Sequence, residues 1–279
     1  MRRLLFVLFF HFIAIIIVQG QSVRRPLAAP LTQLLTFSSL HSSAFNMRAN
    51  QAALARLKEI SAAVYAEKRY NLKELSQYAA TIGIPTSSGN FGISGDYFGD
   101  LSYNESGIGL AYSRRLSEKI DIGVQFNYYN IKSEGYGSAF SVNAEGGIIF
   151  HLTESLNIGF HMYNPMGSPI GKSHEEKLPA IYSAGFGYDV SSKVFIGATI
   201  EKQESEPLNL NAGLHYFFEE RMSACAGISA ATSSYYMGFG IGMKSLHLNM
   251  LASLHPQLGV TPGLLLTFNP SGKAQHNNE

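Results

Sequence analysis

The sequence predicts an all-β protein, a transmembrane antiparallel β-barrel of about fourteen strands with a short N-terminal helical hatch segment. Three observations lead to this fold class. Apolar and polar residues alternate over most of the chain after residue 119, short turns of similar sequence recur between the alternating stretches, and only 15% of the residues are charged. Soluble domains contain about a quarter charged residues, so much of this surface faces something other than water.

The first 20 residues have the features of a secretory signal peptide. Arg2 and Arg3 form a basic start, and an apolar run follows from Leu4 to Val18. The run is shorter than the roughly 20 residues that a membrane-spanning helix needs, so it predicts export rather than an anchor. We expect cleavage after "VQG", which makes Gln21 the first residue of the mature chain.

Residues 21–60 do not follow the strand pattern. The stretch "AFNMRANQAALARLKEI" places Ala49, Ala52, Ala53 and Leu57 at helix-like spacing. It precedes the first strand, where a plug that enters the barrel lumen would be attached. We therefore expect a hatch or plug segment over 21–60, a barrel over 61–269 and a polar tail over 270–279.

Strands are predicted wherever alternation with a period of two gives one apolar face and one polar face. In the stretch from Ile120 to Tyr128, for example, Phe126 belongs to the apolar face and Asn127 to the polar one. The expected strands are 62–70, 75–84, 90–99, 106–116, 119–133, 138–152, 155–163, 178–190, 193–204, 207–218, 221–231, 234–244, 245–255 and 259–269. Most of them are close to the 9–11 residues or so with which a tilted strand crosses a bilayer.

The connections between these strands fall into two classes. Those that follow the even-numbered strands are short and include "LSEK", "LTES", "VSSK" and "FEER". The others include a long one, "NPMGSPIGKSHEEK" at 164–177. Short inner turns with longer outer loops are typical of outer-membrane barrels. The charged tip "GKSHEEK" is interpreted as a solvated loop, with a docking surface for a partner as the alternative.

A soluble β-sandwich or lipocalin-like barrel would also alternate. Its polar face would point to water and carry Lys and Glu. Here the polar face carries mostly Gly, Ser, Asn and His, which indicates a crowded interior with lipid on the opposite face.

The polar face supplies the candidate lumen residues. They are Glu145, His151, His161, Glu201, His215 and His247. A metal or proton site is one reading of the histidines. They come from strands scattered around the barrel, so spaced residues that hydrogen-bond the plug are the favoured interpretation, and we expect no metal. Buried carboxylates need cationic partners, so Glu145 and Glu201 are expected to pair with Arg48, Arg56 or Lys58.

No enzyme chemistry is expected. The sequence has no G-x-S-x-G, H-E-x-x-H, phosphate-binding loop or paired-cysteine zinc spacing, and we expect no cofactor. The net charge of +1 gives no pull toward nucleic acid. Cys225 is the only cysteine, so an intrachain disulfide is excluded.

The segment with its box Asn50-Gln51-Ala52, followed by Ala53-Leu54-Ala55, resembles the "NPA"-type box of the FadL/PorV-like outer-membrane barrels of Gram-negative bacteria. The stretches "VYAEKRYNLKEL", "TSSGNFGI" and "YNESGIGLAYSRRL" resemble the opening strands of PorV-like members. The resemblance implies a closed outer-membrane barrel, occluded by an N-terminal hatch that carries Asn50, Gln51, Ala52 and Leu54. Gln51 stands where the family has proline.

Two functions follow from the resemblance. A FadL-like member is a passive transporter of fatty acids and other hydrophobic or amphipathic small molecules through a lateral opening. The early-strand kink behind that opening would need Gly92 and Gly95. A PorV-like member serves type IX secretion and has secretion-system proteins as partners. We expect outer-membrane lipid around the barrel in both cases.

Overall fold

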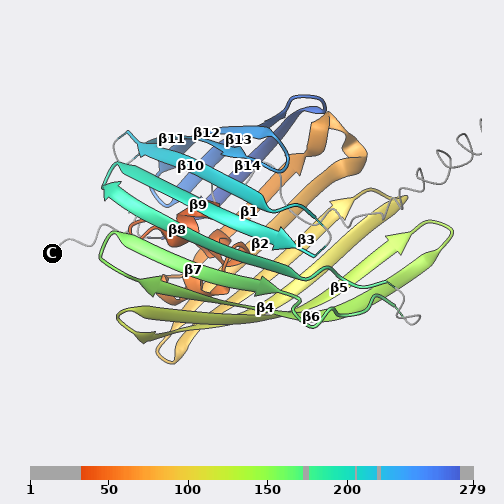
Figure 1. Ribbon diagram of the computed structural model, residues 1–279, viewed down its shortest axis with the longest axis horizontal. Coiled ribbons are helices and arrows are strands. Elements are labelled where there is room, and N and C mark those ends of the chain that lie inside the picture. Colours follow the sequence, from red (N-terminus) through yellow and green to blue (C-terminus); the bar gives the residue numbers. More distant parts are fainter. Residues whose placement is uncertain (1–32, 172–175, 205, 219–220, 271–279) are drawn as a thin grey trace, which may run out of the picture.

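Fourteen antiparallel strands close into a barrel in which every strand pairs with its neighbours in the sequence, and β1 pairs with β14 to complete the ring (Figure 1). The strands are β1 (Ser61–Lys68), β2 (Ser76–Thr86), β3 (Gly89–Gly99), β4 (Tyr103–Ser117), β5 (Ile120–Ser133), β6 (Gly137–His151), β7 (Leu156–Tyr163), β8 (Ile181–Ser191), β9 (Val194–Gln203), β10 (Asn209–Phe217), β11 (Met222–Ser229), β12 (Ser234–Met243), β13 (Leu246–His255) and β14 (Gly259–Phe268). The predicted fold class, a closed antiparallel barrel, is confirmed.

This computed structural model describes residues 33–171, 176–204, 206–218 and 221–270. The expected signal peptide at 1–20, the first part of the expected hatch at 21–32 and most of the expected tail, at 271–279, lie outside the described residues. Within the described ranges, no helix is long and apolar enough to cross a membrane.

Alternation along each strand decides which side chains enter the barrel. On β5 the side chains of Val124 and Phe126 are 48% and 65% exposed on the outside, whereas Asp121 and Gln125 between and beside them are buried inside. The same pattern on the other strands gives an outer surface of exposed aliphatic and aromatic residues and an inner surface that carries many buried polar residues, with apolar clusters such as Phe45 with Tyr65, Leu251 and Leu265 among them. This arrangement is the reverse of a soluble barrel, whose apolar face forms the core.

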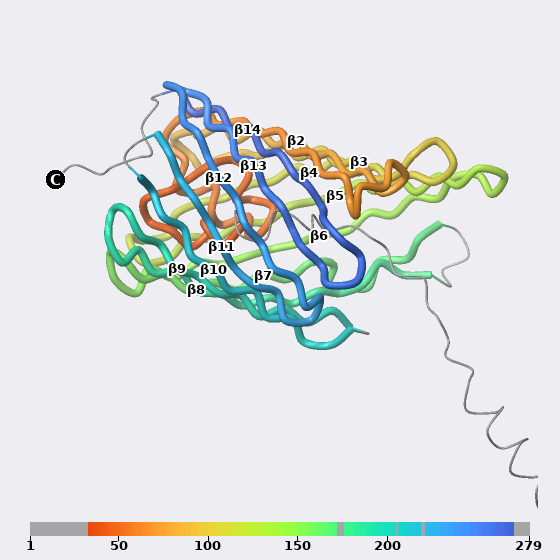
Figure 2. The backbone as a smooth tube through the Cα atoms, turned by 90° about the horizontal axis from the view of Figure 1, so that it is seen from above, coloured from red at the N-terminus to blue at the C-terminus, as the bar shows by residue number. Residues whose placement is uncertain are grey.

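The two ends of the barrel differ. The short turns that follow the even-numbered strands β2 to β12 all lie at one end, here called the turn end, where β1 begins and β14 finishes. The longer connections lie at the opposite loop end. There β4, β5 and β6, with 15, 14 and 15 residues, project beyond the other strands (Figure 2).

The connection from β7 to β8 folds back on itself at the loop end. Asn164 has a left-handed backbone (φ 46°), and its side chain donates to the Leu178 carbonyl at 2.6 Å and accepts from the Ser168 amide at 3.0 Å. These bonds hold residues 176–180 in the loop, with Leu178 fully buried. For that reason β8 begins at Ile181 rather than at the predicted residue 178.

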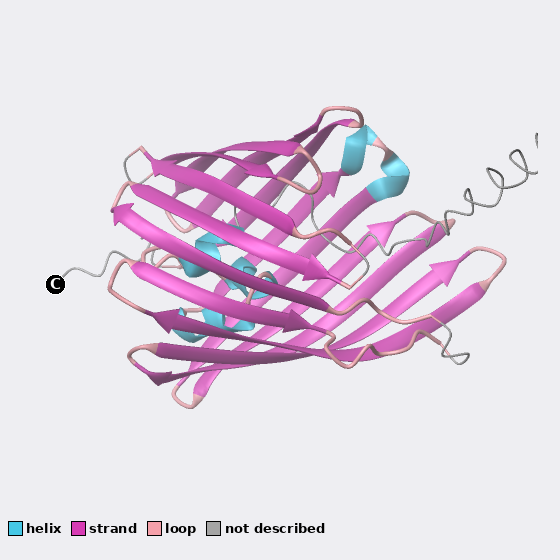
Figure 3. Ribbon diagram, viewed as in Figure 1, coloured by secondary structure: helices cyan, strands magenta, loops and turns pink. Residues whose placement is uncertain are grey.

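Residues 33–60, here called the luminal segment, lie inside the barrel near the turn end, where Figures 1 and 3 show them as short helical turns surrounded by strands. They form three 3-10 turns, η1 (Leu35–Phe37), η2 (Ala44–Arg48) and η3 (Gln51–Arg56), in place of a continuous helix. The helix-like spacing of the alanines is interrupted at Asn50, which has an extended backbone (φ −162°, ψ 118°). Two further 3-10 turns, η4 (Arg69–Asn71) and η5 (Lys73–Leu75), connect β1 to β2.

Candidate functional site

Asn50 is the residue around which the luminal segment turns. Its side-chain oxygen accepts a hydrogen bond from the Ala52 amide at 3.0 Å and so caps η3. Its side-chain nitrogen donates to the carbonyls of Ile148 and Phe160 in the barrel wall, at 3.3 and 3.0 Å. One side chain therefore both starts η3 and attaches it to β6 and β7.

The neighbouring residues of the expected hatch box are fully buried. The side chain of Gln51 donates to the Met47 carbonyl at 3.2 Å within the segment. The backbone at Gln51 and Ala52 passes so close to Gly123 of β5 that a side chain at that position would collide with it. Glycine is needed there because the segment's main chain occupies the volume of a Cβ atom.

One side of the luminal segment is apolar and lies against β2, β3 and β4. Met47, Leu54 and Leu57 are buried in one cluster with Ala111 of β4. Leu57 and Leu54 also fill the space in front of Gly83, and Leu54 and Met47 fill the space in front of Gly92. The wall offers hollows at its glycines here, and the segment fills them with its own side chains.

The opposite side of the segment is polar and is centred on Asp121 of β5. The Asp121 side chain has no exposed surface, and its carboxylate contacts three cationic or titratable groups from three different elements. Arg56 Nε of the segment lies 3.4 Å away, Arg115 Nε of β4 lies 3.2 Å away, and His151 Nε2 of β6 lies 2.7 Å away. Arg56 also donates through Nη1 to the carbonyl of Ser38, which ties η3 to the residues after η1.

Two further wall residues hold the region after η1. Asn157 of β7 donates to the Phe37 carbonyl at 2.7 Å and to the Ser39 hydroxyl at 2.9 Å. Asp189 of β8 accepts from the Ser38 hydroxyl and from the Ser39 amide, both at 2.7 Å. The polar contacts therefore reach from β4 to β8.

His151 has a hydrogen-bond acceptor at each ring nitrogen. Nε2 faces the carboxylate of Asp121, and Nδ1 lies 2.6 Å from Oδ1 of Asn157. The orientation of the Asn157 amide is fixed, because its nitrogen must donate to the Phe37 carbonyl. His151 therefore links Asp121 of β5 to Asn157 of β7.

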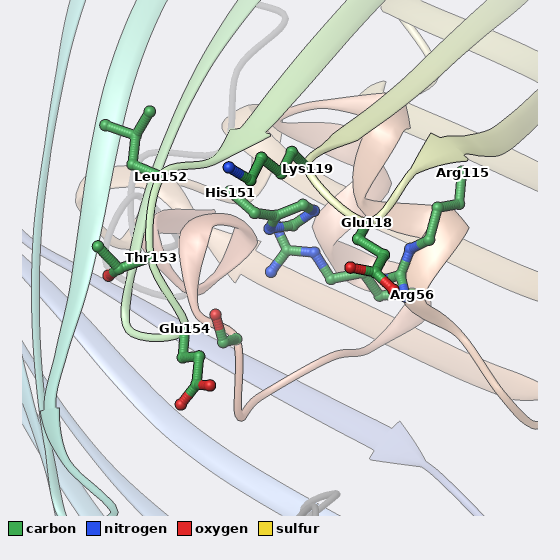
Figure 4. Close-up of a pocket in the computed structure, with 9 residues that line it drawn as sticks. Arg56, Arg115, Glu118, Lys119, His151, Leu152, Thr153 and Glu154 are labelled. Carbon is green, nitrogen blue, oxygen red and sulfur yellow. The ribbon is translucent and has the colours of Figure 1, made fainter.

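A cavity of about 440 Å³ opens beside this cluster at the turn end (Figure 4). Its lining residues are Ser39, Arg56, Arg115, Glu118, Lys119, His151, Leu152, Thr153 and Glu154. In Figure 4 the Arg56 side chain reaches into the middle of this group, next to the His151 ring. Burial lowers the pKa of the Arg56 guanidinium, and the neighbouring carboxylate of Asp121 opposes that shift.

Farther from the turn end, Glu145 organises a second polar network. Its carboxylate accepts from Gln125 and Asn127 of β5, at 2.8 and 2.9 Å, and lies 2.9 Å from Nε2 of His161. Asn127 in turn donates to Asn143 at 2.9 Å. Two of the predicted lumen residues, Glu145 and His161, are therefore in direct contact.

The remaining predicted lumen residues lie elsewhere. Glu201 lies on β9, His247 on β13, and His215 on β10, where its ring stacks with that of Phe217 at 6.3 Å between centroids. In the parts of the chain that the structure describes, no group of three or more His, Cys, Asp or Glu side chains is arranged to hold a metal ion.

The expected ion pairs of the segment differ from the observed ones. Arg48 pairs with Asp96 of β3 at 2.5 Å, and Arg56 pairs with Asp121, rather than with Glu145 or Glu201. The alternation of residues along each strand correctly places these carboxylates on the inner face. Which carboxylate lies beside which arginine depends on the offset between neighbouring strands along the barrel axis. Asp121 is not among the candidates that the sequence analysis names. Its position could have indicated an ion pair, because it starts a strand directly after a turn that follows Arg115 and contains Lys119.

The early strands form an uninterrupted wall. β3 pairs with β2 from Gly89 to Phe98 and with β4 from Asn90 to Gly99. The pairing of β3, which the structure describes completely, is therefore unbroken at Gly92 and Gly95, the two residues that would permit a kink behind a lateral opening. Gly92 faces the luminal segment, while a side chain at Gly95 would point into open space.

Comparison with known proteins finds similarity in structure but not in sequence. No protein-family model matches the chain, and no curated protein matches it. A Pseudomonas aeruginosa FadL homologue superimposes with a TM-score of 0.61 at 12% identity, over 87% of this chain and 99% of that chain.

Two toluene transporters are similar to the same extent. TodX of P. putida gives a TM-score of 0.58 at 9% identity, over 79% of this chain and 92% of that chain. TbuX of Ralstonia pickettii gives 0.57 at 9% identity, over 84% of this chain and 96% of that chain. The described chain therefore shares the fold of the FadL homologue and of these two toluene transporters.

Proposed function

We propose that this chain is an outer-membrane barrel of a Gram-negative bacterium that passes hydrophobic or amphipathic small molecules by passive diffusion, with the luminal segment as its hatch. The apolar outer surface fits a bilayer, and the polar inner surface with its segment fits a closed lumen. The turn end would then face the periplasm. Export would use the signal peptide expected at residues 1–20.

The observation that carries this proposal is the apolar contact between the segment and β2, β3 and β4. Met47, Leu54 and Leu57 fill hollows at Gly83 and Gly92 that would otherwise be apolar cavities in the wall. A small apolar molecule could replace these side chains when the segment shifts, because the hydrophobic effect has no directional requirement. Aromatic hydrocarbons and the alkyl chains of fatty acids both have the apolar surface that such a replacement needs.

In this proposal the hatch residues have separate roles. Leu54 occupies the ligand's place, Gln51 and Ala52 fit the hollow at Gly123, and Asn50 is the pivot. Glu145 and His161 line the lumen beyond the segment, and His151 holds Asp121 and Asn157, the two wall residues that bind the segment at the turn end. Glu201, His215 and His247 are assigned to the lumen wall. The alternative, a type IX secretion partner, is compatible with the uninterrupted wall of β2 to β4, but no feature of the described residues points to a secretion-system protein as partner.

Flux into liposomes tests the function directly. The protein should pass toluene or a long-chain fatty acid while its ion conductance stays low, because the segment fills the lumen. Deleting residues 21–60 should raise the conductance strongly and abolish the preference for apolar solutes. Apolar flux equal to that of protein-free liposomes would contradict transport, and unchanged conductance after the deletion would contradict the hatch.

Membrane insertion is tested by a matched pair of substitutions on β5. Phe126→Arg places a charge on the outer face and should destabilise the barrel by about 2–4 kcal/mol near the bilayer midplane. Asn127→Arg places the same charge inside, near the Glu145 carboxylate, and should cost less. Urea unfolding in liposomes measures both free energies, and equal losses would contradict the assignment of the outer face to lipid.

A further inference from the structure

The cavity at the turn end contains a buried cationic donor without a partner. The Arg56 side chain is only 8% exposed. Its Nε and Nη1 bind Asp121 and Ser38, but its Nη2 is buried and has no hydrogen-bond partner among the described residues. Leaving a buried charged donor unsatisfied is costly, so an acceptor is expected beside this nitrogen.

Other donors converge on the same space. Lys119 is exposed and Arg115 is half exposed in the adjacent turn and strand, and both line the cavity. The Ser39 hydroxyl accepts from Asn157, which leaves its own proton free to donate. These groups present N–H and O–H donors from three separate parts of the chain.

The cationic donors of the cavity favour an anionic ligand. They are Arg56, Arg115 and Lys119. Against these stand Glu118 and Glu154 at the exposed rim, the buried Asp121 in contact with Arg56, and Asp189, which accepts from the Ser39 amide. The carboxylate of Asp121 already faces three partners, so it leaves Nη2 of Arg56 available to a ligand.

We propose that this cavity is an oxyanion-binding site that takes a carboxylate or phosphate group, with Nη2 of Arg56 as its buried donor and Arg115, Lys119 and Ser39 around it. A volume of about 440 Å³ holds far more than one water molecule. Leu152 at the rim is 52% exposed and offers an apolar surface beside the anion. The oxyanion is either a free ion or the headgroup of an amphiphile.

The site can be tested by calorimetric titration of the full-length mature protein in a non-ionic detergent and a chloride-free buffer. Sodium phosphate, acetate and octanoate are the three probes. Saturable binding is expected for at least one of them. Tighter binding of octanoate than of acetate identifies an amphiphile headgroup, and equal binding identifies a free anion.

Four variants locate the binding. Arg56→Lys keeps the charge opposite Asp121 but loses Nη2, and should weaken binding about tenfold or more. Lys119→Gln should weaken it roughly twofold to fivefold, and Glu154→Gln should strengthen it by a similar factor, because both are exposed charges. Lys193→Gln, in the exposed turn between β8 and β9 at the same end, is the control and should change nothing.

Three results would contradict the proposed site or its assigned donor. No saturable heat with any probe means that the cavity holds water only. Undiminished affinity in Arg56→Lys excludes Nη2 as the donor. If Arg56→Lys does not fold, opposite shifts in Lys119→Gln and Glu154→Gln still support the site, and unchanged affinity in both overturns it. Because binding is measured without transport, the result is independent of the proposed function.

Discussion

The luminal segment makes mainly apolar contacts with one part of the barrel wall and mainly polar contacts with another. Toward β2, β3 and β4, aliphatic side chains fill glycine hollows, as with Leu54 against Gly92, and a few polar contacts such as the Arg48–Asp96 ion pair lie beside them. Toward β5 to β8, charged and amide groups hold the segment, as with Arg56 on Asp121, while Ala52 and Ala53 pack on Ile149. The first contact excludes water over an area, whereas the second requires particular atoms at particular distances.

The two kinds of contact have different effects on how precisely the luminal segment is positioned in the barrel. Apolar contacts tolerate a small slide, because their free energy depends on buried area rather than direction. The hydrogen bonds of Asn50, Arg56 and Asn157 permit one register only, because their strength falls steeply with distance and angle. We infer that the polar side positions the segment and that the apolar side is the one able to yield to a ligand.

The largest expected effect comes from removing the centre of the polar side. Asp121→Ala leaves Arg56 buried beside an empty place, which should cost about 3–5 kcal/mol. Hydrogen exchange measured by mass spectrometry should show residues 33–60 losing protection while the strands of the far wall keep theirs. Glu118→Ala, an exposed carboxylate three residues earlier, is the control. Equal protection in Asp121→Ala and the unmodified protein would mean that the apolar side holds the segment alone.

An intermediate effect is expected on the apolar side. In Gly92→Ala the new methyl group meets Leu54 and Met47, which should cost about 1–3 kcal/mol through overpacking. Gly95→Ala, three residues later on the same strand, meets nothing and serves as the control. Thermal unfolding of both variants gives the comparison. If both lower the midpoint equally, the loss arises from the strand rather than from the segment.

The smallest expected effect separates the two roles of Asn50. Asn50→Ser keeps an oxygen that can cap η3 but is too short to reach the carbonyls of Ile148 and Phe160. The loss should be about 1 kcal/mol. Asn50→Ala removes the cap as well and should cost about 1 kcal/mol more. Hydrogen-exchange rates of the η3 backbone amides should be higher in Asn50→Ala than in Asn50→Ser. Identical rates in the two variants would exclude a role for the cap.

The strands can be predicted from the sequence, because the alternation of apolar and polar residues depends only on near neighbours along the chain. A residue such as Phe126 or Asn127 faces out or in according to its neighbours along the chain, and the burial of β5 follows that rule. The start of β8 was misplaced by three residues, since the Asn164 side chain holds the preceding residues in the loop. That bond joins positions 14 apart, and no alternation pattern reports it.

The site was less predictable than the fold. The sequence identified Asn50 and the basic residues of the segment, but the partners of Arg48 and Arg56 depend on the stagger between strands that are distant in the sequence. Asp96 and Asp121 could be chosen over Glu145 only with that stagger known. Likewise, helical spacing predicted one helix where the Asn50 side chain divides the segment into separate turns.

If the barrel spans a membrane, as proposed, the unequal lengths of its strands have a consequence for the surrounding lipid. At about 3.4 Å per residue, a strand of 15 residues such as β4 is roughly 50 Å long and one of 8 residues such as β11 is roughly 27 Å long. Tilted by about 45°, the shorter strand spans only about 19 Å, less than the usual apolar band of about 25 Å. The bilayer should therefore be thinned beside the shortest strands, β1, β7 and β11, and reach full thickness beside β4 and β5. Such a thickness gradient would give the barrel a preferred tilt and a side on which lipid is already strained.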